Sequence, residues 1–282
     1  MHRVDGTTQI YAVLGHPVHH SRSPEMQNAA FAAARMNAIY VALEVPAPRL
    51  DQALAGLHAS RVMGLNLTTP HKEAAFSLTR ARTKEAEEAR AVNTLRWEPD
   101  GWEGHATDGV GFRAWIAETG ISTRAARVLL MGAGGAARSI AGQIMDLGPR
   151  SVQIVSRTAA RAESLVRRLA EAKGHVPLTY SGLELGKRDE ALPWDLMIRA
   201  LAAETVSEEE RRWWEAHAPE AAVMDLNYGA RASEPRTRAG EERLRYEDGL
   251  ALLVHQGAAS FKYWTGKDPS LEAMREAVRG PG

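Results

Sequence analysis

The sequence predicts an α/β protein of two domains in which parallel strands alternate with helices. Short apolar runs alternate with segments of helical periodicity along the whole chain of 282 residues, which is the pattern of parallel strands joined by helices. The length suits two domains of ordinary size, each able to bury a core. A glycine-rich turn between a buried strand and a helix, at residues 132–135, predicts that the second domain is a Rossmann-like nucleotide-binding domain.

The first part of the chain alternates strands with helices and then forms a hairpin. Ser23 is a candidate N-cap, and Pro24 occupies the first position of the helix that follows it. Pro70 ends a short strand, and a helix is expected to begin at Lys72. The expected strands are 11–14, 38–45 and 64–68, the helices are 23–36, 48–60 and 72–76, and the hairpin is 91–107.

The second series of elements begins after residue 120 and includes the glycine-rich turn. Its first helix is expected to end at Gly148, because glycine is the residue that most often follows a helix C-terminus. The expected strands are 127–131, 151–155, 194–200 and 221–228, and the helices are 136–147, 159–174 and 249–266. The polar stretches 188–194 and 230–243 are expected to be loops.

Composition and charge exclude several classes of partner. The chain has 35 basic and 35 acidic residues, so no net field attracts nucleic acid or an anionic membrane. It has no cysteine, which excludes disulfides, thiolate metal sites and a cysteine nucleophile. No apolar run approaches the roughly 20 residues that span a bilayer. We therefore expect a cytoplasmic protein, as a monomer or homodimer, whose partner is a small molecule and neither nucleic acid nor a membrane.

The glycine-rich turn predicts how a nucleotide pyrophosphate would be bound. In the stretch GAGGAAR, Ala137 occupies the third slot of the pattern G-x-G-x-x-G/A. Glycines let backbone amides approach the pyrophosphate, and the helix N-terminus adds free donors and a partial positive charge. The expected cofactor contacts of this turn are Gly132, Ala133, Gly134, Gly135 and Ala136.

The end of the next strand indicates which nucleotide is bound. A NAD-binding domain usually has Asp or Glu about 20 residues after the glycines, where the carboxylate holds the ribose 2′-hydroxyl. This chain has Ser156, Arg157 and Thr158 there, with Arg161 one turn further. A guanidinium with two hydroxyls suits a 2′-phosphate, so NADP is favoured. The alternative is that Arg157 and Arg161 are solvated charges on the face of a helix.

The stretch 15–31 combines two hydroxyls with a helix N-terminus. Ser21 and Ser23 lie where hydroxyl donors and the helix dipole together could bind a carboxylate. Taken alone, Ser23 is better explained as an N-cap. Three histidines of the same loop suggest a metal, but no carboxylate lies at ligand spacing in the sequence, so no metal is expected. These histidines are His16, His19 and His20.

Several stretches, taken in order, resemble shikimate dehydrogenase and its quinate/shikimate relatives. They are HSRSPEMQNAAF, NLTTPHKEAAF, AVNTL, TDGVGF, GAGGAAR, SRTAARA and DGLALLVHQGAASFKYWTG. The resemblance implies a substrate-binding domain of residues 1–110 and 249–282, with C-terminal helices that return to it. A Rossmann-like NADP-binding domain of residues 111–248 would be inserted between these parts. The implied activity is NADP-dependent, reversible reduction of 3-dehydroshikimate to shikimate in aromatic amino acid (chorismate) biosynthesis.

The resemblance also implies a role for each matching residue. Lys72 and Asp108 would be the catalytic pair, because ketone reduction leaves an alkoxide that needs a proton, and a lysine beside a carboxylate can supply it. The residues implied in substrate binding are Ser21, Ser23, Thr68, Asn93, Tyr228 and Gln256. Among these, the two serines and Tyr228 would bind the carboxylate, and the other three would bind ring hydroxyls. The backbone of Gly249 would meet the nicotinamide.

Three stretches depart from the family pattern. Ala106 replaces an asparagine that relatives commonly have two residues before the catalytic aspartate. The segment that starts Arg199-Ala200-Leu201 replaces an Asn-Ala-Thr loop ending in Gly-Met, which puts the cofactor contacts in doubt. Tyr228 lacks the proline that usually follows it by two residues and is equally explained as a half-buried tyrosine at a strand end. The alternatives are therefore a quinate/shikimate or aminoshikimate dehydrogenase, or a non-catalytic NADP-binding relative.

Overall fold

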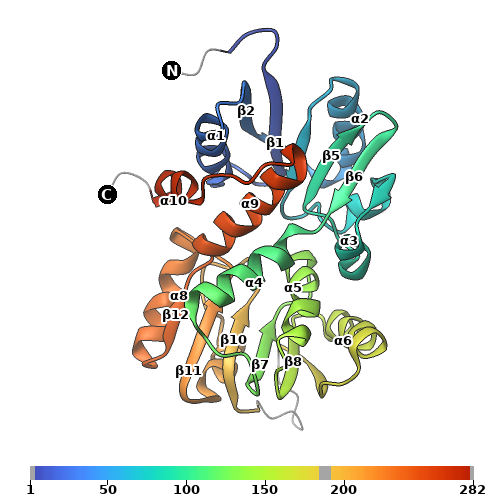
Figure 1. Ribbon diagram of the computed structural model, residues 1–282. Coiled ribbons are helices and arrows are strands. Elements are labelled where there is room, and N and C mark those ends of the chain that lie inside the picture. The colour runs from blue at the N-terminus through green and yellow to red at the C-terminus, as the bar shows by residue number, and fades with distance from the viewer. Residues whose placement is uncertain (1–3, 184–191, 280–282) are drawn as a thin grey trace. The chain divides into compact units, whose positions relative to one another are not determined.

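The computed structural model describes residues 4–183 and 192–279, and the chain divides into two compact units. The first comprises Met1–Ala114 together with Ala251–Gly282, and the second is Trp115–Leu250. The first unit is therefore discontinuous in sequence, and the second is inserted into it. Both are α/β units with a six-stranded sheet (Figure 1).

The sheet of the first unit has the strand order β2-β1-β3-β5-β6-β4. Its strands are β1 (Gln9–Gly15), β2 (Ala38–Glu44), β3 (Gly64–Leu67), β4 (Ala81–Arg82), β5 (Thr94–Glu98) and β6 (Gly101–His105). The helices that begin in this unit are α1 (Ser23–Ala33), α2 (Leu50–Ala59), α3 (Lys84–Ala89), α4 (Thr107–Thr119) and α10 (Leu271–Arg279). Helix α9 (Leu250–Thr265) begins at the end of the second unit and lies otherwise in the first.

Four chain segments of this unit meet at one edge of the sheet. Strands β1 and β3 are parallel and both end there. Strand β5 is antiparallel to β3 and begins there, and β6 is antiparallel to β5 and ends there. Backbone hydrogen bonds join the segments, from Leu67 N–H to Asn93 O (2.9 Å) and from Asn93 N–H to His105 O (3.1 Å). Residues that are distant in sequence are thus brought together at this edge.

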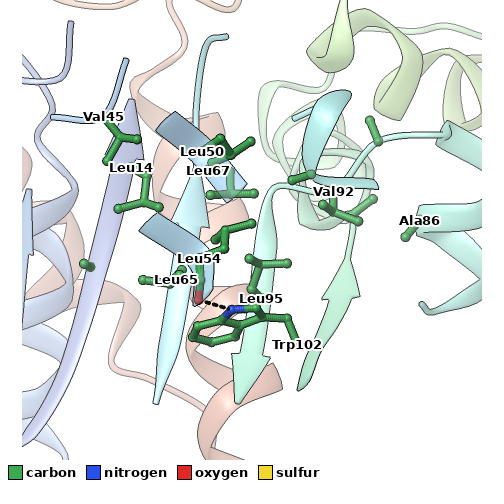
Figure 2. Packing of buried hydrophobic residues seen from close by; sticks show 14 of the residues in the cluster. Leu14, Val45, Leu50, Leu54, Leu65, Leu67, Ala86, Val92, Leu95 and Trp102 are labelled. Atoms are coloured by element: carbon green, nitrogen blue, oxygen red, sulfur yellow. Dashed lines mark hydrogen bonds between the residues drawn. The ribbon is translucent and has the colours of Figure 1, made fainter. Parts of the chain in front are cut away.

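A buried apolar cluster supports the strands that lead to this edge. Leu65, Leu67 and Leu95 extend from the sheet, and α2 covers them with Leu54 (Figure 2). Trp102 of β6 closes the cluster, and its indole Nε1 donates to Leu54 O at 2.9 Å (Figure 2). Full burial of one such side chain contributes about 1.5–3 kcal/mol, so this cluster fixes the strand ends firmly.

The second unit has an all-parallel sheet of the order β12-β11-β10-β7-β8-β9. Its strands are β7 (Arg127–Met131), β8 (Ser151–Ser156), β9 (Leu178–Gly182), β10 (Trp194–Arg199), β11 (His217–Asp225) and β12 (Arg245–Glu247). Its helices are α5 (Gly135–Asp146), α6 (Ala159–Lys173), α7 (Glu208–Glu215) and α8 (Ala230–Glu241). If the six strands are renumbered 1 to 6 by their order in the chain, so that β7 is 1 and β12 is 6, the sheet read from β9 has the order 3-2-1-4-5-6. This is the order of dinucleotide-binding sheets. The point where the order reverses lies between β7 and β10 (Figure 1), and ligands bind at the carboxyl ends of such strands.

Three local predictions were wrong. The stretch 230–243 was expected to be a loop, but most of it forms α8, because Ala232, Pro235 and Ala239 form a buried stripe at helical spacing among the charged residues. The helix expected from Lys72 is instead a short 3₁₀ helix, Ala74–Leu78. The N-cap of α1 is Arg22, and Ser23 is the first helical residue. Of the other expected loop, residues 188–191 lie outside the described part of the chain, and Trp194 begins β10.

Candidate active site

A lysine–aspartate pair lies at the sheet edge of the first unit. Lys72 follows β3, and its Nζ lies 2.6 Å from Asp108 Oδ2. The side chains are only 16% and 9% exposed. Asp108 lies in the first turn of α4, where the helix dipole favours a negative charge. The backbone of the lysine is fixed as well, because Lys72 O accepts from Val92 N–H at 2.9 Å.

Asn93 holds the other oxygen of the carboxylate. Its Nδ2 donates to Asp108 Oδ1 at 2.8 Å and to Thr107 Oγ1 at 2.9 Å, and its Oδ1 accepts from Thr107 N–H at 2.7 Å. Asn93 is buried, so these bonds are shielded from water. The carboxylate is therefore bound by the ammonium on one oxygen and by an amide on the other, which leaves it little freedom to rotate.

A buried hydrogen-bond network lies behind this pair and was not predicted. Asn66 Nδ2 donates to Ser260 Oγ at 2.9 Å and to Thr94 Oγ1 at 3.1 Å. Tyr40 donates its hydroxyl to Asn66 Oδ1 at 2.7 Å, and Thr94 lies 3.1 Å from Thr107, measured between the hydroxyl oxygens. Asn66 falls within a recognised motif, but Ser260 is 194 residues further along the chain, and no spacing rule predicts their contact.

Gln256 joins the same group from helix α9. Its Oε1 accepts from Asn93 Nδ2 at 3.4 Å, and its Nε2 donates to Leu253 O at 2.9 Å. The approach of α9 to α4 depends on Gly111, because a Cβ there would lie 2.6 Å from the backbone nitrogen of Gln256. Gly111 thus has a packing role that the sequence did not indicate.

Thr68, Ser21 and Ser23 belong to the same edge. Thr68 follows β3, and its Cγ2 packs on the backbone of Gly15. A Cβ at position 15 would lie only 2.4 Å from this Cγ2. Ser23 is buried in the first turn of α1. Ser21 accepts the Ser23 N–H on its Oγ at 3.3 Å, so the hydroxyl of Ser21, and not that of Ser23, satisfies a helix-terminal amide.

Tyr228, expected to bind substrate, and Gly249, expected to meet the nicotinamide, belong to the second unit, whereas the other residues expected to bind substrate belong to the first. Tyr228 is half-buried after the end of β11. Gly249 donates its N–H to Asn227 O at 2.8 Å, and a Cβ at Gly249 would lie 2.2 Å from Leu226 O. A close backbone approach therefore accounts for this glycine, and the ligand roles of both residues stay predictions.

The predicted glycine-rich turn lies between β7 and α5. Gly132 has φ +116°, and a Cβ there would lie 2.6 Å from Ala200 O, so this position requires glycine. Gly134 is the N-cap of α5, with open space where a Cβ would point. The first amides of α5, which include those of Gly135 and Ala136, have no partner within the helix and can bind an anion. Ala133 is buried between the glycines.

The residues expected to distinguish NADP from NAD lie at the end of β8 and the start of α6. Ser156 is buried, and its Oγ accepts from Thr158 N–H at 3.4 Å. Arg157 and Arg161 are exposed, and neither forms an ion pair with a carboxylate of residues 4–183 or 192–279. The guanidiniums of Arg157 and Arg161 thus follow β8, at the same edge of the sheet as the glycine-rich turn that follows β7.

Arg199, at the end of β10, is fully buried within a charged network. Its side chain lies 3.1 Å from Glu210 Oε2 and 3.2 Å from Asp225 Oδ2. Burial disfavours the charged guanidinium, but the two carboxylates outweigh it and raise the pKa of Arg199. Burial raises the pKa of both Glu210 and Asp225, against the opposing effect of Arg199.

The histidine loop of the first unit gives no metal site within the described residues. No group of three or more potential ligand side chains is close enough there to hold an ion. His16 does approach a carboxylate, since its Nδ1 lies 3.0 Å from Glu44 Oε1 on the neighbouring strand, a contact that sequence spacing did not predict. Across the described helices, none combines the length and apolarity that a bilayer crossing requires.

Comparisons with known proteins point to one family over most of the chain. Three family models match it: the shikimate dehydrogenase substrate binding domain over residues 13–95, shikimate / quinate 5-dehydrogenase over 116–221, and the shikimate 5'-dehydrogenase C-terminal domain over 249–279. The shikimate dehydrogenase (NADP(+)) of Anaeromyxobacter dehalogenans is 41% identical over 96% of this chain and 95% of its own.

Two solved structures match nearly the whole chain. The shikimate dehydrogenase of Aquifex aeolicus has a TM-score of 0.84 and 27% identity, over 98% of this chain and all of its own. The shikimate 5-dehydrogenase of Thermus thermophilus, solved with NADP(H) and shikimate, has a TM-score of 0.79 and 31% identity, over 96% of this chain and 99% of its own.

Proposed function

Because the chain belongs to the shikimate dehydrogenase family, we propose that Lys72 and Asp108 are the catalytic pair of a shikimate dehydrogenase. The protein is an NADP-dependent oxidoreductase of the shikimate pathway. It reduces 3-dehydroshikimate reversibly to shikimate, on the way to chorismate and the aromatic amino acids. The observation that carries the residue assignment is the contact of 2.6 Å between Lys72 Nζ and Asp108 Oδ2 at a sheet edge.

Lys72 supplies the proton in the reduction. When a hydride adds to the ketone carbon, the C=O π electrons move to the oxygen, which needs one proton to become the hydroxyl. Lys72 donates it as an ammonium, and in the oxidation it accepts the same proton back. Asp108 holds the ammonium in place and accepts a hydrogen bond from the substrate hydroxyl. Asn93 keeps the carboxylate in the required orientation through its bond of 2.8 Å.

The residues of the second unit fit NADP. NADPH supplies the hydride when it is bound. The amides of the turn Gly132, Ala133, Gly134, Gly135 and Ala136 bind the pyrophosphate, which approaches closely because Gly134 has open space in place of a Cβ. Arg157 and Arg161, with the hydroxyls of Ser156 and Thr158, bind the 2′-phosphate. The backbone of Gly249 meets the nicotinamide.

The first unit binds shikimate through neutral polar groups around the charged pair. Ser21 and Ser23 bind the carboxylate at the N-terminus of α1, where hydroxyls and the helix dipole act together. Thr68, Asn93 and Gln256 bind ring hydroxyls from the same edge of the sheet. Tyr228 adds a further contact to the carboxylate.

The domain boundaries, location and assembly complete the proposal. Substrate binding belongs to residues 1–110 and 249–282, and NADP binding to 111–248. The balance of 35 basic and 35 acidic residues gives no net field that attracts an anionic membrane, and we place the protein in the cytoplasm. It acts as a monomer or a homodimer, which light scattering after size-exclusion chromatography would distinguish.

A panel of substrates and cofactors tests the function. The purified chain is mixed with shikimate and NADP, with shikimate and NAD, and with quinate and NADP, and reduced nicotinamide is followed by its absorbance. We expect the highest kcat/KM with shikimate and NADP. A higher kcat/KM with quinate would make it a quinate/shikimate dehydrogenase. A chain that binds NADP and forms no NADPH with any of these acids would be a non-catalytic relative.

A further inference from the structure

The segment 200–206 follows β10 beside the glycine-rich turn and is held in one conformation at several points. Ala200 N–H donates to Met131 O at 2.8 Å, and Ala200 O packs against Gly132 at the position of the missing Cβ. Leu201 O accepts from Asn227 Nδ2 at 2.7 Å. The segment therefore forms a wall at the point where the strand order reverses, next to the turn proposed to bind the pyrophosphate.

Arg199 holds the middle of this segment from inside the fold. Its Nη1 donates to Ala203 O and its Nη2 to Thr205 O, each at 3.1 Å. The same guanidinium is fixed in turn by Glu210 and Asp225. All three of its nitrogens are used, and the planar fork of arginine can make these bonds at once, whereas the single nitrogen of lysine cannot.

We propose that Arg199 is a positioning residue for the cofactor. By binding the carbonyls of Ala203 and Thr205 it fixes the 200–206 wall, and the affinity for NADP depends on that wall. The departure from the family pattern at Arg199-Ala200-Leu201 is then a different way to build the cofactor site and not a loss of it. This inference rests on the proposed function, because it assumes that the glycine-rich turn binds NADP.

The test compares Arg199→Lys with a matched control, Arg127→Lys. Arg127 also forms a bidentate contact, with Asp195, but at the opposite ends of the adjacent strands β7 and β10. The dissociation constant of NADP⁺ is measured by titration calorimetry at a temperature where every variant is folded. We expect at least a tenfold rise for Arg199→Lys with kcat within about threefold of the wild type, and less than a twofold change for the control.

A second variant, Glu234→Ala, tests the same inference if Arg199→Lys fails to fold. Glu234 is exposed on α8, and its Oε2 accepts from Val206 N–H at 2.7 Å, at the far end of the wall. Glu234→Ala removes that anchor and keeps every hydrogen bond of Arg199, and we expect about a threefold rise in the dissociation constant. Hydrogen exchange of the 200–206 amides should become faster in both variants.

The outcomes separate this inference from the proposed function. If the wild type does not bind NADP⁺, the proposed function is wrong. If the wild type binds and every folded variant at Arg199 or Glu234 binds equally well, the positioning role is wrong, even where the melting temperature has fallen. A loss of affinity with an unchanged exchange rate at 200–206 would also contradict it, because the wall would then not be the cause.

Discussion

Lys72 Nζ lies 2.6 Å from one oxygen of Asp108, and Asn93 Nδ2 lies 2.8 Å from the other. The three residues come from the turn after β3, the segment before β5 and the first turn of α4. The antiparallel pairing of β3 with β5 and of β5 with β6 brings these segments to one edge. The topology of the sheet, more than any single contact, thus creates an ammonium–carboxylate pair with fixed orientation.

Replacing Lys72 should remove proton transfer and leave substrate binding largely intact. We expect Lys72→Ala to lower kcat by about 10²–10⁴-fold, the usual contribution of a positioned acid–base group, with a smaller change in the KM for shikimate. The control is Lys84→Ala on α3, whose side chain is 84% exposed, and it should retain wild-type rates. If Lys72→Ala binds shikimate and turns over within about tenfold of the wild type, Lys72 is not the proton donor.

Ser23 should contribute to the KM for shikimate and not to kcat. A hydrogen bond to a charged group is worth about 1.5–3 kcal/mol, so Ser23→Ala should raise the KM at least tenfold through the substrate carboxylate. Shikimate methyl ester, which has no carboxylate charge, is the matched comparison and should show a much smaller effect. An equal effect on acid and ester would mean that Ser23 acts only through the start of α1.

The two arginines after β8 should discriminate NADP from NAD. Only NADP has the 2′-phosphate, so the double variant Arg157→Ala, Arg161→Ala should raise the KM for NADP at least tenfold and leave the KM for NAD unchanged. Arg167→Ala is the control, since Arg167 lies on α6, as Arg161 does, and pairs with Glu163. Equal losses with both cofactors would show that the arginines do not bind the phosphate.

The sequence predicted the elements with strong periodicity and missed those defined by tertiary contacts. The glycine-rich turn, β7, β8 and α6 were all predicted close to their observed bounds, because each has a continuous local pattern. Helix α4 was not predicted: it begins with Thr107-Asp108-Gly109 and has a further glycine at 111, and glycine lowers helix propensity. Packing against α9, which Gly111 permits, stabilises it instead.

The candidate site shows the same division. The residues with family motifs, such as Lys72 and Asn93, could be named from sequence because each motif is local. The supporting network of Asn66, Thr94 and Ser260 could not, because it joins β3, β5 and α9 across the first unit. The buried network of Arg199 was also missed, since its partners Glu210 and Asp225 have no distinctive spacing.

Gly132 should be intolerant of a side chain, in contrast to a glycine of the adjacent helix. Alanine at φ +116° is strained, and its Cβ would lie 2.6 Å from Ala200 O, so Gly132→Ala should lower the free energy of unfolding by about 1–3 kcal/mol or more. Gly142→Ala, within α5, meets only ordinary contact at 3.7 Å and should raise it by about 0.5–1 kcal/mol. Urea unfolding measures both, and equal midpoints would contradict the predicted close approach.

One buried and one half-buried histidine should make the fold less stable in weakly acidic solution. Burial is the main cause that lowers the pKa of His71 and of His105. Between the lowered folded-state pKa and the unfolded value of about 6.5, the unfolded chain binds more protons than the folded chain. The free energy of unfolding therefore rises with pH in this window, and the stability is lost as the pH falls below about 6.5. Each histidine contributes a slope of at most about 1.4 kcal/mol per pH unit.

His105 allows this slope to be assigned to one residue. Its ring packs on Tyr263 with 4.8 Å between the centroids, and its Nδ1 lies 2.7 Å from Thr83 Oγ1. His105→Phe keeps the ring contact and removes the titration, so the free energy of unfolding should change less steeply as the pH falls below about 6.5. Thr83→Ala removes the hydrogen bond and the N-cap of α3 but keeps the imidazole. It should lower stability at every pH and preserve the slope, since the titrating imidazole keeps its half-buried position. A slope that is unchanged in His105→Phe would mean that His105 is protonated equally in the folded and unfolded chains.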